Sequence, residues 1–307
     1  MPVRRIAALA LLLAAPLLAA EKEETITKSY PSHAGKVVLV DAASLDLTVR
    51  STDIPDIRVK VELSAAAFKE AQAKAWIDAH RPTLEDSEDT LKIIAPEASG
   101  FGLLKGVVIS KARIEIIVPS TVRPDLSVSS GNLQVDGEYP RGTPMRLRAA
   151  SGDVEFTGWT PDLESRSTSG DITVLATKAI DTLLVRTASG AVHLTGGARS
   201  VRCDSSSGDV FLNGLIGPLK IATTSGKVTA RFDALQASDA VSITTSSGWV
   251  RVTLPPGAQP SGEITSSKGE IRSSYPGQSP AEGGQLNLGG SGPKVVITTT
   301  SGKVELM

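Results

Sequence analysis

From about residue 124 to its last residues, the chain alternates apolar and polar positions around a recurring Ser-Gly phrase. Aliphatic side chains recur five residues before and two residues after the glycine, and further apolar positions recur seven before and four after. Because successive side chains of a strand point to opposite faces, the two segments that flank each phrase are predicted to be short, half-buried strands. The phrase is the predicted turn, with its glycine at Gly131, Gly152, Gly170, Gly190, Gly208, Gly226, Gly248 and Gly302, and in a Ser-Lys-Gly variant at Gly269.

Self-similarity at a period of roughly 20 residues is typical of repeat proteins, whose units bury their apolar faces only by stacking on one another. Two architectures fit the alternation. If each Ser-Gly is a corner, the chain coils as a parallel β-solenoid; if each is a two-residue hairpin turn, the strands pair antiparallel within each repeat. Like residues at like positions favour the solenoid, because each coil then stacks on its own copy about 4.8 Å away. We therefore expect an all-β protein with a parallel β-helix of about nine such coils.

Residues 25–122 precede the repeats and are predicted to form a β-rich N-terminal cap module. Ile57–Leu63 alternates apolar and charged residues as a strand does, and Ser64 is a suitable N-cap for a helix over about 64–80. The Gly-rich stretch 99–106 is a predicted loop. At the other end, the Gly/Pro/Ser-rich segment 273–293 is a predicted capping loop, because the open ends of a solenoid need protection from edge-to-edge association. The repeats thus span 124–307.

The first 20 residues have the layout of a secretory signal peptide. Arg4 and Arg5 precede an apolar stretch that ends in small residues at Ala20, and this stretch is too short for a good membrane span. Without a further long apolar run, the mature chain is expected to have no transmembrane segment. We expect an exported protein that is periplasmic, on the cell surface or secreted. A membrane anchor at the same place is the alternative.

Composition narrows the function classes. Removal of the two leader arginines changes the formal net charge from −1 to −3, so the basic surface of a nucleic-acid-binding protein is not expected. Cys203 is the only cysteine, which excludes an intramolecular disulfide. Aromatic residues make up only 4% of the chain, which suits thin stacked strands better than a bulky core.

The phrases Ser-Gly-Asp-Val (151–154 and 207–210) and Ser-Gly-Asp-Ile (169–172) resemble those of the bacterial DUF4097 family. The stretch Leu-Asn-Leu-Gly-Gly (286–290), which leads into a final strand–Ser-Gly–strand unit, is similar to that family as well. The resemblance covers about residues 35–307 and implies an exported β-solenoid of a family labelled "putative adhesin". It transfers no site residues. Lys227, Trp249 and Lys303 stand where the phrase has Asp, which argues against a continuous Asp column.

Catalytic chemistry finds little support in the sequence. The repeated serines lack the strained elbow of a nucleophile and are suited to turns. Asp153 and Asp171 on neighbouring repeats, with Asp209 further on, form a series that Ala191 interrupts and Lys227 ends, so no catalytic residue and no metal site is predicted. The three histidines lack metal-ligand spacing, Cys203 occupies an aliphatic position as a buried thiol, and no cofactor is expected.

A column of arginines on the outward face is the strongest candidate for binding. Arg148, Arg166 and Arg186 take the same position in three consecutive repeats, and Arg146, Arg202 and Lys220 share the face with Glu164 and Asp204. Adjacent guanidinium groups repel one another unless an anion lies between them, and Arg is suited to bidentate contacts with carboxylate or phosphate. The expected partners are therefore an acidic glycan, lipid phosphate or another envelope protein, and no nucleic acid.

Together these features predict a non-catalytic, exported binding or structural module of the cell envelope. The alternative is a polysaccharide-active lyase or hydrolase on a parallel β-helix, an idea that rests on fold analogy alone. Such an enzyme needs several acidic or basic groups clustered on one face, usually beneath long loops. Here the loops between repeats are mostly short and the acidic residues are scattered.

Overall fold

The computed structural model describes residues 20–97, 106–140, 144–276 and 283–307, whose strands form two sheets of thirteen strands each. Sheet A has the order β1 (Ala20–Pro31), β4 (Asp56–Ala67), β7 (Val107–Pro119), β3 (Asp46–Thr52), β9 (Leu133–Glu138), β11 (Val154–Trp159), β13 (Ile172–Ala176), β15 (Val192–Thr195), β17 (Val210–Leu215), β19 (Val228–Phe232), β21 (Val250–Thr253), β26 (Val304–Leu306), β23 (Ile271–Ser273). Sheet B has the order β24 (Gly284–Gly289), β22 (Ser261–Ser266), β25 (Lys294–Thr299), β20 (Ala240–Ser247), β18 (Leu219–Ser225), β16 (Val201–Ser207), β14 (Thr182–Ser189), β12 (Asp162–Ser167), β10 (Met145–Ala149), β8 (Arg123–Val128), β2 (Val37–Asp41), β6 (Thr90–Ile94), β5 (Thr83–Asp86).

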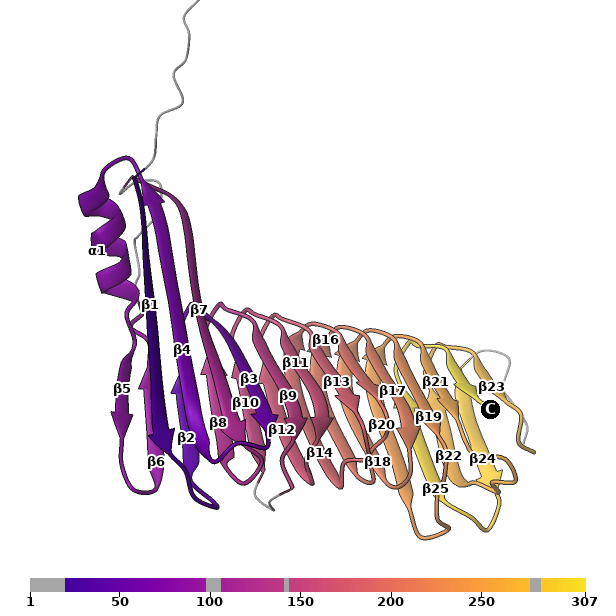
Figure 1. Ribbon diagram of the computed structural model, residues 1–307. Helices are drawn as coiled ribbons and strands as arrows, with labels where there is room; N and C mark the ends of the chain where they lie inside the picture. The colour runs from indigo at the N-terminus through magenta and orange to yellow at the C-terminus, as the bar shows by residue number, and fades with distance from the viewer. Residues whose placement is uncertain (1–19, 98–105, 141–143, 277–282) are drawn as a thin grey trace, which may run out of the picture.

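The repeats coil; they do not form hairpins. Within each repeat a strand of sheet B leads through the Ser-Gly corner into a strand of sheet A, and each strand pairs in parallel with the equivalent strand of the next repeat (Figure 1). The register keeps like positions together, so that Leu147 lies beside Ser165 and Ser165 beside Val185. The expected parallel solenoid architecture is confirmed, and the hairpin alternative is wrong.

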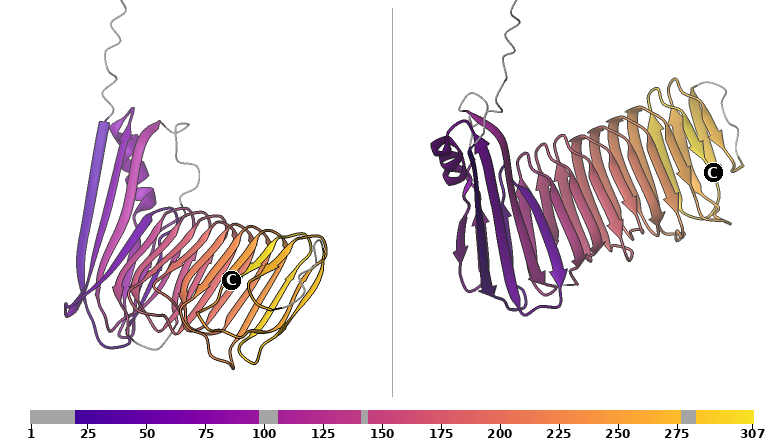
Figure 2. Two further views of the ribbon diagram at one scale, coloured as in Figure 1. Left: turned by 90° about the vertical axis from the view of Figure 1, so that its right-hand side faces the viewer. Right: turned by 45° about the horizontal axis from the view of Figure 1, so that its top comes forward.

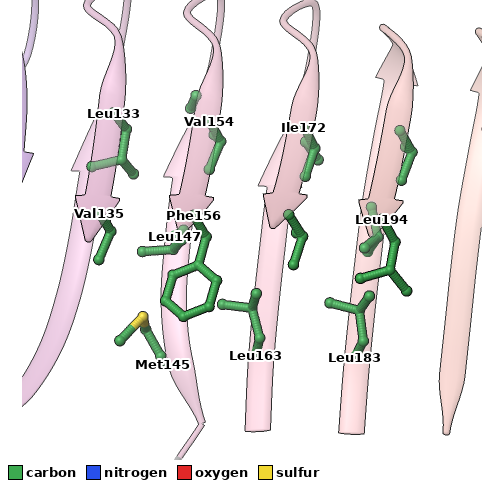
Figure 3. Packing of buried hydrophobic residues seen from close by; sticks show 14 of the residues in the cluster. Leu133, Val135, Met145, Leu147, Val154, Phe156, Leu163, Ile172, Leu183 and Leu194 are labelled. Carbon is green, nitrogen blue, oxygen red and sulfur yellow. The ribbon is translucent and has the colours of Figure 1, made fainter. Parts of the chain in front are cut away.

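The core lies between the two sheets and is built from the predicted aliphatic columns. Figure 3 shows Leu133, Val154 and Ile172 in one row on sheet A, with Leu163 and Leu183 of sheet B among the side chains below them. Each of these five residues is at most 1% exposed, and the Phe156 ring in the same layer is fully buried. Full burial of one such side chain contributes about 1.5–3 kcal/mol, so the columns supply most of the stabilisation of the stack.

The corner glycines are required by close packing of one coil on the next. A Cβ atom on Gly152 would lie 1.8 Å from the Gly131 carbonyl oxygen, and one on Gly170 would lie 2.1 Å from that of Gly152. Neither residue has a left-handed φ, so steric contact alone accounts for glycine there. At Gly208 both reasons apply, because φ is +120° and the Cβ contact would be 2.2 Å.

Serine, threonine and aspartate side chains complete the corners with hydrogen bonds to the backbone. The Gly170 N–H donates to Ser167 Oγ over 2.9 Å, which closes the turn from inside. Outside, Asp153 Oδ1 accepts the Asp171 N–H at 2.9 Å, and Asp171 Oδ1 accepts the Ala191 N–H at 2.7 Å. The aspartate of one coil therefore holds the backbone of the next, which explains why Asp follows Ser-Gly.

At the N-terminal end the same two sheets continue beyond the repeats. Strands β2 and β3 pair in parallel with β8 and β9, so residues 37–52 form another turn of the coil. Sheet A then changes to antiparallel pairing among the long strands β7, β4 and β1, which extend beyond the coil as an arm (Figures 1 and 2). The expected signal peptide, residues 1–20, lies outside the described residues except for Ala20. The expected loop 99–106 lies outside them except for Gly106.

The helix begins later than the sequence indicated. Helix α1 spans Glu70–His80, whereas a helix from Ser64 was expected. Strand β4 continues to Ala67, because Ser64 pairs with Lys111 of β7 on one side and with Glu23 of β1 on the other. The alternating burial of Ala65 and Ala67 fits this extended strand, and the buried face of α1, which includes Trp76, packs on the arm. Pairing on both edges therefore outweighs the helix propensity of the alanines.

The C-terminal end differs from a simple succession of coils. Strands β25 and β26, the last in the chain, insert between β20 and β22 and between β21 and β23. The expected capping loop 273–293 is not entirely loop, because its residues 284–289 form β24, which pairs antiparallel with β22 at the edge of sheet B. Leu286 and Leu288 of β24 are buried, so this strand gains apolar burial at the position where a loop was expected.

Candidate functional site

The predicted arginines lie side by side on the outer face of sheet B. The parallel register places Arg148 beside Arg166, and Arg166 beside Arg186, on β10, β12 and β14. Arg202 and Lys220 are likewise neighbours on β16 and β18. We call this surface, with Arg146, Arg148, Arg166, Arg186, Arg202 and Lys220, the arginine face.

Carboxylates of the same surface separate the guanidinium groups. Asp125 Oδ1 lies 2.7 Å from Arg148 Nη1, and the Asp125 carboxylate also contacts Arg146. Glu164 pairs with both Arg146 and Arg166, and Asp204 Oδ2 lies 3.0 Å from Arg202 Nε and 3.7 Å from Arg186 Nε. Adjacent guanidinium groups need an anion between them, and here the carboxylates of the chain itself supply it. An external anion is not needed to hold the arginines together.

The ion pairs orient the guanidinium groups and leave much of each exposed. Burial tends to raise the pKa of Glu164, but hydrogen bonds and charges from Arg166 and Arg146 outweigh it and hold that pKa below its ordinary value. The arginine side chains stay 42–52% exposed. Lys220 has no carboxylate within ion-pair distance among the described residues. On the outward side of β8–β18, seven basic side chains accompany four acidic ones, which leaves three formal positive charges in excess.

A shallow hollow adjoins this surface near the Ser-Gly corners. Its volume is about 540 Å³, and it is lined by Arg186, Thr187, Asp204, Ser205, Ser206, Ala222, Thr223 and Thr224. Three of its five hydroxyl residues are buried, and the hydroxyls of Ser205 and Thr223 donate to backbone carbonyls. The other two, Ser206 and Thr224, are exposed at the hollow beside one guanidinium and one carboxylate. These are the hydrogen-bonding groups that suit a ligand rich in hydroxyls and carrying a negative charge.

Asp125 is the functional neighbour that the sequence interpretation left out. It occupies the position six residues before Gly131, which corresponds to Arg146 before Gly152 and to Glu164 before Gly170. The signal lies in the register of the repeats, because the first repeat has a carboxylate at the position where the second has an arginine.

The other polar candidates are occupied by structural contacts. Asp153, Asp171 and Asp209 each accept a backbone N–H from the next coil, as described for the corners. Cys203 is fully buried, and burial together with the nearby Asp204 raises the pKa of its thiol to about 12. Among the described residues, no group of three or more His, Cys, Asp or Glu side chains is placed to hold a metal ion. None of the helices in the described ranges is long and apolar enough to cross a membrane.

Fold and surface together define a parallel β-solenoid with flat outer faces, one of them lined by arginine–carboxylate pairs. A family model described as Toastrack DUF4097 matches residues 38–307. The chain belongs to this family, as the Ser-Gly-Asp phrases indicated.

Comparison with solved structures finds chains that align with this one over most of its length. A "putative lipid binding protein" from Parabacteroides distasonis is 13% identical with a TM-score of 0.48, and the alignment covers 92% of this chain and 96% of that one. A "putative adhesin" from the same species is 15% identical with a TM-score of 0.46, covering 92% and 97%. One from Bacteroides fragilis, also described as a "putative adhesin", is 12% identical with a TM-score of 0.42, covering 92% and 97%. Comparison with curated proteins finds no match.

Proposed function

We propose that this protein is an exported, non-catalytic binding module of the cell envelope, adhesin-like in role, whose arginine face holds an acidic glycan. The observation that carries the proposal is the in-register column of half-exposed arginines with its excess of positive charge. Exposed ion pairs contribute only about 0–1 kcal/mol each, so a ligand carboxylate or sulfate can replace Asp125, Glu164 or Asp204 at small cost. The adjoining hollow offers the exposed Ser206 and Thr224 for the neutral part of a sugar.

Two observations support a role without catalysis and disfavour the lyase or hydrolase alternative. A glycoside hydrolase needs a carboxylic acid with a raised pKa beside a second carboxylate. The most buried carboxylate of the arginine face, Glu164, has a lowered pKa instead. The aspartates that follow the Ser-Gly corners are engaged by backbone amides, so they serve the stack of coils.

We also propose that both ends of the repeat region 124–307 are caps. Residues 25–122, which include the arm and α1, cover the first of about nine predicted coils, and residues 273–293 protect the last. Support comes from β24 on the edge strand β22 and from the long antiparallel strands at the opposite end. Such caps keep exposed strand edges from pairing with other chains.

The test measures binding of the purified protein to immobilised polygalacturonate, neutral dextran, polyphosphate and anionic lipid vesicles. We expect retention on polygalacturonate, weakened by salt because exposed charges are screened. The triple variant Arg148→Gln/Arg166→Gln/Arg186→Gln should bind about tenfold more weakly, since three exposed contacts of about 0.5 kcal/mol each are lost.

The matched control is Arg50→Gln/Arg81→Gln/Arg113→Gln, which removes three ion-paired arginines of sheet A and of the end of α1, away from the arginine face. It has the same net charge as the test variant and should bind like the unaltered protein. Equal losses in the two variants would mean that net charge alone matters, which overturns the site. Binding to vesicles alone would replace the glycan by lipid phosphate, and release of reducing sugar from the polymer would refute the non-catalytic role.

A further inference from the structure

The outer face of sheet A, on the opposite side of the coil, carries a cluster of rings. His193 of β15 lies directly beside Phe211 of β17, and their rings stack with centroids 5.0 Å apart at an interplanar angle of 13°. Trp249 precedes β21, two strands further along the same face. Phe211 and Trp249 belong to different repeats, and the structure joins them through a residue of the repeat between them.

That residue is Lys227, which directly precedes β19, the strand between β17 and β21. Its ammonium nitrogen lies 4.5 Å from the centroid of Trp249 and 5.6 Å from that of Phe211. The guanidinium of Arg251 stacks on Trp249 at 4.3 Å. Cations over aromatic faces are attracted by the ring quadrupole, so these contacts fix both the rings and the charges. We call His193, Phe211, Lys227, Trp249 and Arg251 the ring face.

The charges of the ring face are unevenly compensated. Arg251 donates to Glu305 Oε2 at 2.9 Å, and Lys303 Nζ lies 2.8 Å from Glu305 Oε1. Hydrogen bonds from Lys303 and Arg251 accordingly hold the pKa of Glu305 below its ordinary value. Lys227 has no carboxylate within ion-pair distance in the described ranges, and the nearby Asp209 uses Oδ1 to accept the Lys227 backbone N–H at 2.8 Å. A positioned, uncompensated ammonium group therefore lies between two aromatic rings.

We propose that the ring face is a second binding site, specific for a sugar ring that bears a carboxylate or sulfate group. The faces of the two rings already carry His193, Lys227 and Arg251. The apolar C–H side of a pyranose therefore packs against the parts of the half-buried Phe211 and Trp249 rings that stay exposed. Its anionic group pairs with Lys227 Nζ. The inference rests on the proposed function only in taking an acidic glycan as the ligand, because the ring face lies on sheet A and the arginine face on sheet B. Sites on both faces allow one molecule to bridge two polymer chains.

The two sites differ in what they require of a ligand, and this separates their tests. The arginine face requires negative charge, which polyphosphate and polygalacturonate both supply. The ring face requires a sugar ring together with a negative charge, and polygalacturonate supplies both. Polyphosphate lacks the sugar ring, and dextran lacks the charge. We expect Phe211→Ala/Trp249→Ala to lower the affinity for polygalacturonate at least tenfold and to leave the affinity for polyphosphate unchanged. Leu175→Ala, which removes another exposed apolar side chain from sheet A, should change neither.

A second measurement uses the fluorescence of Trp249 in a Trp159→Phe background, because Trp159 is also partly exposed whereas Trp76 is only 5% exposed. Polygalacturonate should protect Trp249 fluorescence from acrylamide quenching, both in this background alone and when it is combined with the triple arginine variant of the arginine face. Lys227→Met, which keeps the aliphatic stem between the rings, should lose this protection. Unchanged quenching with bound polygalacturonate, or full affinity in Phe211→Ala/Trp249→Ala, would overturn the ring face. Polyphosphate binding should be lost only in the arginine variant. This readout tests the arginine face alone, so the failure of one site can be told from the failure of the other.

Discussion

The corner glycines offer the most direct test of the stacked-coil architecture, through the substitution Gly152→Ala. The added Cβ would lie 1.8 Å from the Gly131 carbonyl oxygen, so the two corners must move apart by more than an ångström. This movement strains the hydrogen bond from Ser151 N–H to the Ser129 carbonyl (2.8 Å) and that from Leu133 N–H to the Asp153 carbonyl (2.9 Å). Overpacking of this kind costs about 1–3 kcal/mol, and each weakened hydrogen bond about 0.5–1.5 kcal/mol.

Alanine also has a favourable effect, because it loses less conformational entropy than glycine and is worth about 0.5–1 kcal/mol in extended structure. We therefore expect a net loss of about 1–5 kcal/mol, measured as the urea midpoint of unfolding by far-UV circular dichroism. With a slope of about 2 kcal/mol per M, the midpoint falls by about 0.5–2.5 M. Hydrogen exchange should localise the weakening to the coils on either side of residue 152, since each coil contacts only its neighbours.

Two other glycines separate steric contact from backbone strain. Gly289 has an ordinary φ and nothing within 4 Å of a built Cβ, so Gly289→Ala should be neutral or slightly stabilising. Gly257 has the same open surroundings but a φ of +80°, so Gly257→Ala reports the cost of a left-handed backbone alone. If Gly152→Ala costs no more than Gly289→Ala, close stacking is not the reason for the glycine column.

Further outcomes follow from single contacts. Ser165 is fully buried with an unpaired hydroxyl in the aliphatic column, so Ser165→Ala should raise the unfolding free energy by about 1 kcal/mol in urea titrations. Asp171→Ala should lower it by about 0.5–1 kcal/mol, because the Ala191 N–H loses its acceptor, while Asp171→Asn should retain most of the stability. Burial lowers the pKa of His80 below its ordinary 6.5, although a hydrogen bond to the Trp76 carbonyl opposes this shift. The unfolding free energy should therefore fall as the pH drops below about 6.5. In His80→Phe this part of the fall should be absent. Deletion of 294–307 should unfold the C-terminal end and promote aggregation seen by light scattering, because it removes strands with partners on both sides.

The repeat pattern was sufficient to predict the coil, because stacking in register imposes a separate demand on each position. Leu147 and Ile221, at the same distance before their turn glycines, are at most 1% exposed. The corner phrase predicted turns with equal success, although its main physical reason differs from turn conformation. Gly152 and Gly170 have ordinary φ values, and the close approach of one backbone to another became visible only once the coils were stacked.

Long-range pairing explains what the local pattern failed to predict. Ser64 to Ala67 have the composition of a helix start, yet partners on both sides, one of them from residues 20–31, keep them extended. The order of the last coils is a similar case. Ile264 and Ile297 occupy equivalent positions in successive repeats, but nothing local indicates that the later one lies nearer to Ile243 of the earlier coils. The extended conformation of Ser64 to Ala67 and the order of the last coils both depend on which strand edge of the sheet is free when another strand pairs with it.

The two candidate surfaces were predictable to different degrees, because one depends on contacts within a single column of the repeat and the other on contacts between columns. Arg148, Arg166 and Arg186 lie side by side as their common offset implied, because the parallel register preserves offsets from one coil to the next. The ring face depends on contacts between different offsets: Lys227 and Trp249 follow their turn glycines directly, whereas Phe211 lies two residues further along. Contacts across offsets depend on side-chain conformations, which a column alignment does not contain.

The aspartate-to-backbone hydrogen bonds of the corners and two side chains of the ring face need the same position of the repeat, so each coil can have only one of them. Directly after the turn glycine, Asp153, Asp171 and Asp209 hold the backbone of the following coil. Ala191 already interrupts the series, and the hydrogen bond from the Lys227 N–H to Asp209 is its last member. Lys227 and Trp249 occupy the position in the next two coils and have no acceptor to offer. Each missing bond forgoes about 0.5–1.5 kcal/mol of stabilisation, and each exposed cation–π contact contributes about 0.5–1 kcal/mol, so the two effects are of similar size. The exchange therefore adds no clear stability to the regular repeat, while it presents rings and charge to solvent, and this is consistent with ligand binding.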